Sequence, residues 1–444
     1  MRVLMLGWEF PPAITGGLGV ASEGLVEGLL TAGARVTLVL PRDPGPVAVA
    51  QPGLTVLDAS AFPFREARAA PKGMRRPGSA YAPARPWRRP ARSARERFSS
   101  AADAYGPDLV SEVLRFAEAA GRIARRERFD VIHAHDWLTF LAGLEARRVS
   151  GRPLVVHVHA TELDRAGNLD NRFVRDIEAM GVRLADRVIA VSNATALRLA
   201  EVYGVPPSRL TVVHNALGKK TKRRRRRRPL ARRRSPLVLF AGRVTWQKGP
   251  GLFLEAAARV ARELPRARFV VAGAGDLLPA MIARARSLGI GRKVSFPGFV
   301  PEAALDRLYG EADVFVSPSA SEPFGLAALE AVAHGTPAIV SRNAGVTEVV
   351  ASVLRVDFAD VEDLADKITT VLKSPKLARA FAARGRAEAR RLSWGRAARE
   401  CLRIYGEILG PGTRADAGNE SESATARRRG RTTPRTSPSS RPRA

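Results

Sequence analysis

The sequence predicts an α/β protein made of two doubly wound domains, each built on a parallel sheet. Short apolar runs such as 2–6, 154–158 and 268–272 are nearly continuous, which is typical of strands buried on both faces. Helix-length segments separate most of these runs, as expected for parallel strands joined by helical crossovers. An unbroken basic run at 219–234 divides the pattern into two halves, each long enough to bury its own core.

The expected elements follow from these patterns in chain order. In the first half we expect strands at 2–6, 35–40, 131–133, 154–158, 188–191 and 210–213. In the second half we expect strands at 237–240, 268–272, 293–296, 314–317 and 338–340. The clearest helical segments are 18–30, 110–125, 253–263 and 326–334. Residues 394–409 carry apolar side chains at largely helical spacing, so we expect a helix there that packs back onto a domain surface.

These elements give a plan of the whole chain. We expect a first domain at 1–217 with a basic loop at 65–97, a polybasic linker at 218–235, a second domain at 236–392, a C-terminal helix at 393–410 and a disordered basic tail at 411–444. Two such domains would face each other across a cleft. In doubly wound sheets, ligands bind outside the carboxyl ends of the strands, so the loops that follow the strands are the candidate sites.

The chain is strongly basic, with 73 Lys and Arg against 43 Asp and Glu and a formal net charge of +30. Most of the excess lies in three segments: 219–234 contributes +12, 65–97 contributes +9 and 411–444 contributes +5. These segments show no sustained periodicity, which indicates a linker, a loop and a tail. Two interpretations stay open for them: solvated loops, or weak contact of 219–234 and the tail with a polyanion or an anionic membrane.

The composition excludes several classes of protein. With 45% hydrophobic residues, neither wholesale disorder nor a collagen-like fibre is expected. The chain has no run of about 18 apolar residues, and its start lacks the long apolar region of a secretory signal. Cys401 is the only cysteine, so it cannot form an internal disulfide, and we expect a reducing, cytoplasmic location.

Two loops join a strand to the start of a helix through small or basic residues. After the first strand the chain reads GWEFPP at 7–12 and GGLG at 16–19. Small residues let the backbone approach a ligand, and helix N-terminal amides suit a phosphate, although a tight turn without a ligand fits equally well. In the second domain, Arg243 and Lys248 follow the first strand. They could neutralise a diphosphate leaving group or be ordinary surface charges.

Two carboxylates lie eight positions apart in SEPFGLAALE at 321–330. Glu322 is expected in a turn and Glu330 about one turn inside the following helix, so both could reach one pocket from different depths. The apolar neighbours of Glu330 make its charge costly to bury without a partner. A solvated helix face is the alternative.

Four of the six histidines lie near the ends of two expected strands. IHAHDW at 132–137 holds His133, His135 and Asp136, and VHVHATE at 156–162 holds His157 and His159. Strand alternation sends His157 and His159 to the same face. Structural hydrogen bonding and contact with a sugar or phosphate are both open. No ligand set with recognisable metal spacing completes a metal site, so none is expected.

Together these motifs resemble those of retaining glycosyltransferases of the GT-B fold, group 1 (family 4). The glycogen synthase-like members are the most similar. The resemblance covers about residues 1–60 and 105–410 and rests on the order of GWEFPP and GGLG, HAHDW at 133–137, Arg243 with Lys248, and EPFGL at 322–326 with Glu330.

The resemblance implies a function for each domain and for individual residues. The first domain would face the acceptor, with Asp136 on that side, and the second would bind the nucleotide sugar. Arg243 and Lys248 would bind the diphosphate and stabilise it as it leaves. Glu330 would hold the ribose, while Glu322 and His159 would contact the transferred sugar. The backbone amides expected at the donor phosphates belong to Gly17, Leu18, Gly19, Gly345, Val346 and Thr347.

The resemblance also implies the chemistry. A glucosyl unit would pass from ADP-glucose or UDP-glucose to an α-glucan with retention, and the departing diphosphate would help to deprotonate the acceptor. No metal or other cofactor is expected, and the sequence has no Asp-x-Asp. Two alternatives are a group-1 transferase with a lipid-linked or small-molecule acceptor and, from another class, a polyanion-binding protein on a degenerate transferase scaffold. The filled positions Arg243, Lys248, Glu322 and Glu330 argue against the second alternative.

Two departures from the family pattern bear on the site. Ile14 stands where many bacterial starch and glycogen synthases have Lys, which removes one expected phosphate contact. After His214 and Asn215, the usual glycine, hydrophobic residue and aspartate are replaced by Ala216, Leu217 and Gly218, so closure at the hinge is expected to differ.

Overall fold

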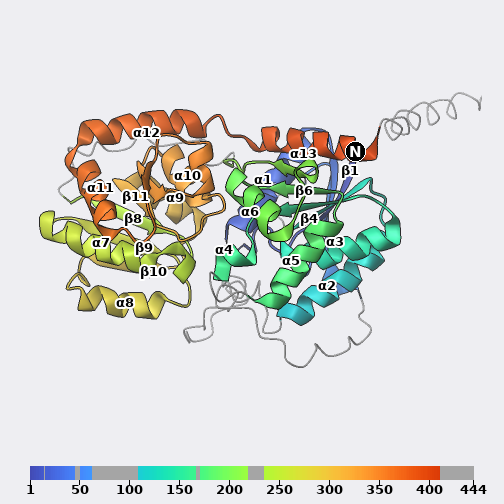
Figure 1. Cartoon of the computed structure of the whole chain (residues 1–444), viewed down its shortest axis with the longest axis horizontal. Helices are drawn as coiled ribbons and strands as arrows, with labels where there is room; N and C mark the ends of the chain where they lie inside the picture. Colours follow the sequence, from blue (N-terminus) through green and yellow to red (C-terminus); the bar gives the residue numbers. More distant parts are fainter. Residues whose placement is uncertain (15, 46–50, 63–108, 167–170, 219–234, 411–444) are drawn as a thin grey trace, which may run out of the picture.

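The computed structural model describes residues 1–14, 16–45, 51–62, 109–166, 171–218 and 235–410. The segments 65–97, 219–234 and 411–444, predicted as loop, linker and tail, lie outside the described residues. The described chain forms two parallel sheets with helices on both faces (Figure 1). The predicted class of two doubly wound α/β domains is therefore confirmed.

The first sheet has seven parallel strands in the order β3-β2-β1-β4-β5-β6-β7. Its central strands are buried throughout, because their side chains are covered from both faces. The strands are β1 (Arg2–Leu6), β2 (Arg35–Leu40), β3 (Leu54–Asp58), β4 (Val131–His135), β5 (Leu154–Val158), β6 (Arg187–Ala190) and β7 (Leu210–Val212).

Helices cover the two faces of this sheet separately. Helices α2, α3 and α5 pack on one face through residues such as Phe116 and Phe140, whereas α1 and the C-terminal helix α13 pack on the other. The helices are α1 (Gly17–Thr31), α2 (Leu109–Ala124), α3 (Trp137–Ser150), α4 (Glu162–Ala166), α5 (Arg172–Leu184) and α6 (Asn193–Tyr203).

The second sheet has six parallel strands in the order β10-β9-β8-β11-β12-β13. Its strands are β8 (Leu237–Ala241), β9 (Arg268–Ala272), β10 (Val294–Gly298), β11 (Val314–Ser317), β12 (Ala338–Ser341) and β13 (Leu354–Val356). The helices around it are α7 (Pro250–Glu263), α8 (Leu278–Ser287), α9 (Glu302–Glu311), α10 (Leu326–Ala333), α11 (Val361–Lys373) and α12 (Pro375–Ala389).

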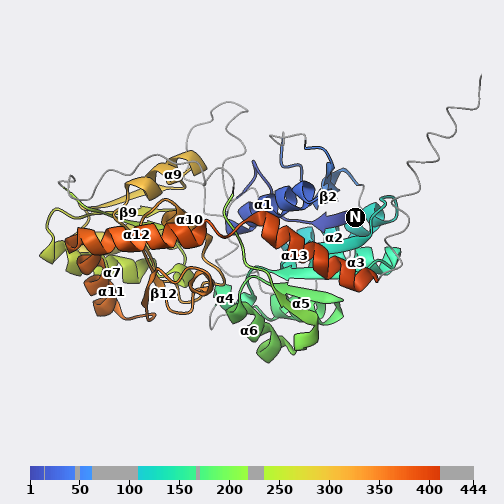
Figure 2. The ribbon, with the colours of Figure 1, turned by 90° about the horizontal axis from the view of Figure 1, so that it is seen from above.

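Helix α13 (Trp394–Leu409) returns to the first domain after α12 has crossed the second (Figure 2). It packs against α1, as the helical spacing of 394–409 predicted. The two helices approach closely at Gly24 and Gly28, where an added Cβ would lie 2.1 Å from Trp394 Nε1 and 2.5 Å from the Trp394 carbonyl oxygen. The docking of α13 therefore depends on two glycines of α1.

The sequence patterns missed two strands and ended several others early, β4 and β10 by two residues each. The edge strands β3 and β13 have mixed burial and no continuous apolar run, so they lack the signal of a doubly covered strand. Strand β4 extends to His135, beyond the expected end at 133, because His133 and His135 are fully buried within it.

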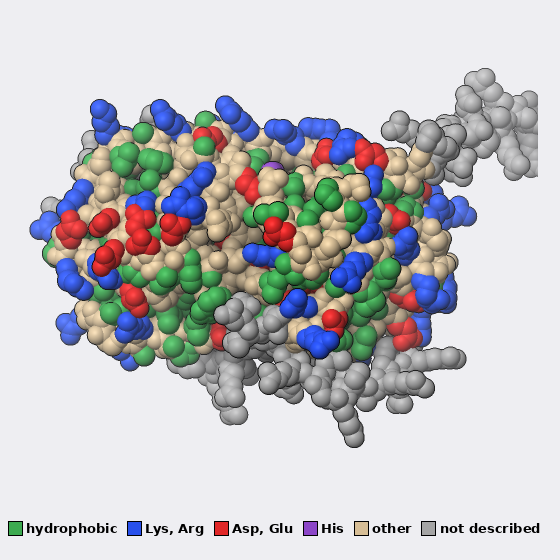
Figure 3. Space-filling view, viewed as in Figure 1, with side chains coloured by type: hydrophobic (Ala, Val, Ile, Leu, Met, Phe, Trp, Pro, Cys, Tyr) green, Lys and Arg blue, Asp and Glu red, His purple; other side chains and the backbone are tan. Residues whose placement is uncertain are grey.

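The described surface is not uniformly basic. On the face in Figure 3, Lys and Arg side chains alternate with Asp and Glu side chains over both domains. Among the described helices, none has the length and apolar character that crossing a bilayer requires.

Candidate active site

Several of the predicted site residues follow the strands on either side of the point where the strand order reverses in each sheet. In the first sheet this point lies between β1 and β4, and in the second between β8 and β11. Gly17 and Asp136 come after the first pair of strands, and Arg243 and Glu322 after the second. Doubly wound sheets bind ligands at this position. The topology therefore brings the separate motifs to one end of each domain.

Lys248 and Glu322 form an ion pair, with Lys248 Nζ 2.7 Å from Glu322 Oε2. Both side chains are mostly buried, at 19% and 13% exposure. Ser319 Oγ also donates to Glu322, at 3.2 Å. Arg243 follows β8, at the carboxyl end of the same sheet, and is partly buried. A cation and a carboxylate that share a partly buried loop can bind a diphosphate and a sugar hydroxyl respectively.

Gly249 explains how Lys248 reaches this position. It has a φ of +67°, and an added Cβ would lie 2.1 Å from the Pro318 carbonyl oxygen. Only glycine allows that conformation and that approach together. The loop before α7 is also tied to the loop after β11 by hydrogen bonds from Ala320 N to Gln247 O and from Gln247 Nε2 to Ser321 O.

The predicted phosphate amides of Gly345, Val346 and Thr347 are already used within the protein. Gly345 N donates to the Glu322 carbonyl, Val346 N to the Phe324 carbonyl and Thr347 N to the Ala344 carbonyl. These residues begin the 3-10 helix η9 (Gly345–Glu348), which holds the Glu322 loop in place. In this structure they support the carboxylate, and a phosphate contact from their amides would require those bonds to break.

Gly17, Leu18 and Gly19 form the first turn of α1, where backbone amides have no partner within the helix. No side chain caps this turn. A Cβ added at Gly17 would lie 3.4 Å from Leu326 at the start of α10. The N-terminus of α1, in the first domain, therefore faces the N-terminus of α10 in the second. Such an N-terminus favours a phosphate group.

Glu330 lies on α10 and is partly buried. Burial raises the pKa of its carboxyl to about 7, while a hydrogen bond with the Tyr309 hydroxyl acts in the opposite direction. Tyr309 is the partner that the apolar surroundings of Glu330 require. A carboxylate in this setting can accept hydrogen bonds from two neighbouring hydroxyl groups, such as those of a ribose.

The four predicted histidines form a stack on one face of the first sheet. The ring centroids of His133 and His135 are 4.5 Å apart and those of His157 and His159 are 4.4 Å apart. Burial lowers the pKa of His133 to about 3 and that of His135 and His157 well below 6.5, so these rings are neutral. His133 Nδ1 also bonds the Tyr405 hydroxyl of α13.

Three of these rings have nitrogen atoms close enough to be considered as metal ligands. The ligand atoms of His133, His135 and His157 lie within 4.8 Å of one another. A metal ion needs each lone pair to point at it, and each lone pair lies in its ring plane. The three rings are nearly parallel, at 12–27°. Their lone pairs therefore do not converge, and coordination of one ion would require the rings to turn.

Asp136 holds the turn that carries His159. Its Oδ1 accepts hydrogen bonds from His159 N at 2.6 Å and Ala160 N at 3.3 Å. The carboxylate is 6% exposed. Asp136 therefore acts within the protein, on the backbone beside the site, in addition to any contact with an acceptor that the resemblance implies.

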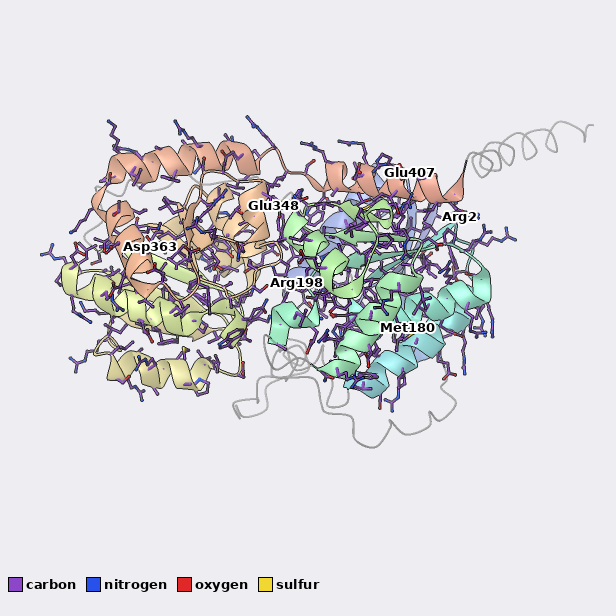
Figure 4. The ribbon with its side chains drawn as sticks, viewed as in Figure 1. Arg2, Met180, Arg198, Glu348, Asp363 and Glu407 are labelled. Carbon is purple, nitrogen blue, oxygen red and sulfur yellow. The ribbon has the colours of Figure 1, made fainter. Side chains whose placement is uncertain are left out.

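Two carboxylates that lie outside the predicted motifs join the domains. Asp164 Oδ1 of α4 accepts from the Ser321 hydroxyl at 2.5 Å and from Arg198. Glu348 of η9 accepts from Asn193 N at 2.9 Å and Ala194 N at 3.1 Å, at the start of α6. Figure 4 shows Arg198 and Glu348 at the boundary between the domains. The two contacts connect the first domain to the residues beside Glu322.

A local signal existed for Asp164 but not for Glu348. Thr161 and Asp164 have the spacing of a reciprocal helix cap, and Asp164 Oδ2 accepts from Thr161 N at 2.7 Å. Glu348 also accepts from His214 Nε2, at 2.7 Å. Its partners lie 134 to 155 residues away in the chain, so no sequence pattern connects them.

Comparison with known families agrees with this fold. The family model described as Glycosyltransferase Family 4 matches residues 15–217, and the model described as Glycosyl transferases group 1 matches residues 221–388. A glycogen synthase of Mycobacterium tuberculosis is 32% identical over 406 residues, which cover 87% of this chain and 90% of that protein. The chain therefore belongs to the group-1 (family 4) glycosyltransferases and is an enzyme of that class.

Other relatives and structures extend the comparison. A D-inositol 3-phosphate glycosyltransferase of Thermobispora bispora is 33% identical and covers 64% of this chain and 71% of that protein. Sucrose-phosphate synthase of Thermosynechococcus elongatus has a TM-score of 0.71, at 20% identity over 92% of this chain and 99% of that chain. Anabaena HepE in complex with UDP and glucose has a TM-score of 0.66, at 18% identity over 91% and 99%. These structural matches show the GT-B fold.

Proposed function

We propose that the protein transfers a glucosyl unit from ADP-glucose or UDP-glucose to an α-glucan, with retention at the anomeric carbon. The observation that carries the donor half is the Lys248–Glu322 ion pair, held in a partly buried loop beside the first domain. Support for the glucan acceptor comes from the similarity to a mycobacterial glycogen synthase over 87% of this chain. We place the reaction in the cytoplasm, where nucleotide sugars and a reduced Cys401 are both expected.

The proposed reaction breaks the bond between the glucosyl C1 and the diphosphate oxygen and forms a bond from C1 to the acceptor oxygen. Arg243, Lys248 and the first-turn amides of α1 stabilise the negative charge that develops on the diphosphate. The acceptor proton passes to that departing diphosphate. Glu322 and His159 hold the sugar, and Glu330 holds the ribose. Closure of the two domains excludes water, so transfer is favoured over hydrolysis.

A small-molecule acceptor is the second candidate. The 33% identity to a D-inositol 3-phosphate glycosyltransferase favours it, although that match covers 64% of this chain. A lipid-linked acceptor belongs to the same group of alternatives. These candidates differ from the first in the acceptor, so the acceptor has to be varied in the test.

The test incubates the full chain with radiolabelled ADP-glucose, UDP-glucose or GDP-mannose. Each donor is combined with glycogen, inositol phosphate, a lipid extract or no acceptor. We expect label in an ethanol-insoluble glucan with a glucose donor. Label in inositol phosphate or in lipid would support the second candidate. Absence of turnover with every pair would contradict both and favour a protein that uses the scaffold for binding alone.

Contact of the basic segments with polyanions remains a separate proposal. The comparison is heparin affinity of the full chain and of a variant in which the twelve basic residues of 219–234 are replaced by Ser and Gly. If the segment binds polyanions, the variant should lose affinity and the salt dependence should weaken. Equal affinity would remove the proposal.

A further inference from the structure

His159 is clamped by two consecutive residues at the end of β4. His135 Nδ1 lies 2.9 Å from His159 Nε2 and forms a hydrogen bond with the His159 ring. Asp136 Oδ1 accepts from His159 N, so it holds the backbone. The pairing of His135 with His157 across β4 and β5 places His135 opposite the strand that leads to His159. Ring and backbone are therefore both fixed from the neighbouring strand.

The hydrogen bond between the two rings requires opposite roles for its two nitrogen atoms. Burial lowers the pKa of both His135 and His159, so both rings are neutral and each carries one proton. Either His135 donates from Nδ1 to His159 Nε2, or His159 donates from Nε2 to His135 Nδ1. The choice decides which nitrogen of His159 carries its proton.

The second nitrogen of His135 favours the first of these arrangements. His135 Nε2 is buried and has no hydrogen-bond partner among the described residues. If the His135 proton were on Nε2, a donor would be buried without an acceptor, whereas a proton on Nδ1 leaves only a lone pair unmatched. Buried N–H groups without a partner are the rarer of the two in proteins. His135 therefore donates from Nδ1, and His159 accepts at Nε2.

We propose that His135 is a positioning residue that holds His159 in its Nδ1–H tautomer. His159 is partly exposed, and its Nδ1 is the ring nitrogen that His135 does not engage. It would then present a neutral N–H donor to an oxygen atom of the bound nucleotide sugar, a hydroxyl or a phosphate oxygen. The identity of that ligand rests on the proposed function, whereas the tautomer itself does not.

The test is direct observation of the tautomer in the full-length, ligand-free protein. Long-range ¹H–¹⁵N correlation spectra of ¹⁵N-histidine-labelled protein distinguish protonated from unprotonated ring nitrogens, and the His159→Gln spectrum assigns the signals. We expect His159 to be protonated at Nδ1 at pH 7. Protonation of His159 at Nε2 in the wild-type protein would overturn the proposal whatever the positioning variants show.

Three variants separate positioning from a structural role. His135→Leu removes the donor, so the His159 signals should move toward a mixture of tautomers and the kcat of glucosyl transfer should fall about 10-fold. His135→Asn places an amide N–H near the lost Nδ1–H and should restore both. His157→Leu removes the other ring stacked on His159 but no hydrogen bond, so the tautomer should stay unchanged. An unchanged His159 tautomer in His135→Leu would overturn the proposal.

Titration of the wild-type protein with UDP-glucose and ADP-glucose distinguishes failure of this proposal from failure of the proposed function. A shift of the His159 Nδ1 signal on donor addition supports the placement of the sugar beside His159. The expected tautomer without such a shift would contradict that placement while leaving the role of His135 intact.

Discussion

At the scale of single residues, the Lys248–Glu322 pair has the sharpest consequence for activity. We expect Lys248→Ala and Glu322→Ala each to lower the rate of sugar transfer by about 10²-fold or more, because each removes a charge that acts on the reacting donor. The rates are to be measured with the labelled donors, with circular dichroism to show that the fold is kept.

A matched pair serves as the control. Lys373 and Glu263 also form a Lys–Glu ion pair of the second domain, but both are about half exposed. Exposed pairs contribute at most about 1 kcal/mol. Lys373→Ala should therefore keep normal activity. Near-normal turnover in Lys248→Ala would show that the candidate site is wrong.

The raised pKa of Glu330 predicts that the free energy of unfolding depends on pH. Its folded pKa of about 7 lies above the ordinary value of 4.5, so the native protein binds more protons than the unfolded chain between these values. The free energy of unfolding should therefore fall as the pH rises from about 4.5 to about 7. Glu330→Gln removes this titration, and its stability should vary less with pH, by at most about 3 kcal/mol over the window.

Urea unfolding at several pH values measures this difference. Burial also raises the pKa of Glu178 to about 7, so the stability of Glu330→Gln should still change with pH. The test is therefore whether its pH slope is smaller than that of the wild type. Glu362→Gln is the control, since the Glu362 side chain is 83% exposed. Equal pH slopes in wild type and Glu330→Gln would contradict the prediction.

At the same scale, the sequence predicted candidate residues after the strands but not all of their contacts. The residues at strand ends were found because loops after parallel strands are where ligands bind. The amides of Gly345 and Val346 hold the Glu322 loop, and their partners lie in that loop about twenty residues earlier. No local pattern carries that information.

At the scale of elements, the contact of α13 with α1 depends on the absence of a side chain. Gly24→Ala places a methyl group 2.1 Å from Trp394 Nε1. We expect overpacking to lower the free energy of unfolding by about 1–3 kcal/mol. Gly395→Ala on α13 is the control, because its Cβ would meet only the flexible Arg399, at 3.7 Å. Chemical unfolding of both variants tests this, and equal midpoints would contradict it.

The elements themselves were largely predictable, and the two missed strands share one cause. Buried central strands such as β5 appear as continuous apolar runs, so their bounds were found. The edge strands β3 and β13 are covered on fewer sides and carry polar residues, so they resemble loops. No local sequence pattern specifies which strands pair in a sheet, so the strand orders are known only from the structure.

At the scale of the whole molecule, the last described residues of the first domain are buried at the domain boundary. Ala216 packs in the core of the first domain and Leu217 in that of the second. The replacement of the usual hinge residues thus lies where two cores meet. Most of the +30 charge excess, 26 charges, lies in segments outside the described residues.

Glu348 is the whole-molecule contact whose loss should be easiest to measure. Burial opposes its ionisation, but hydrogen bonds from Asn193, His214 and Ala194 outweigh that and lower its pKa. A charged carboxylate from the second domain thus caps α6 of the first, where the helix dipole favours it. Glu348→Ala leaves those donors without their acceptor and should favour separation of the domains.

We therefore expect Glu348→Ala to increase the radius of gyration in solution scattering and to raise the KM for the donor about 10-fold. A loss of 1–2 kcal/mol from charged hydrogen bonds gives a change of that size. Glu362→Ala, an exposed carboxylate of the same domain, should change neither quantity. If Glu348→Ala also leaves both unchanged, the domains are held by their other contacts instead, the Asp164–Ser321 hydrogen bond and the apolar packing of Leu217 and Leu326 at the boundary.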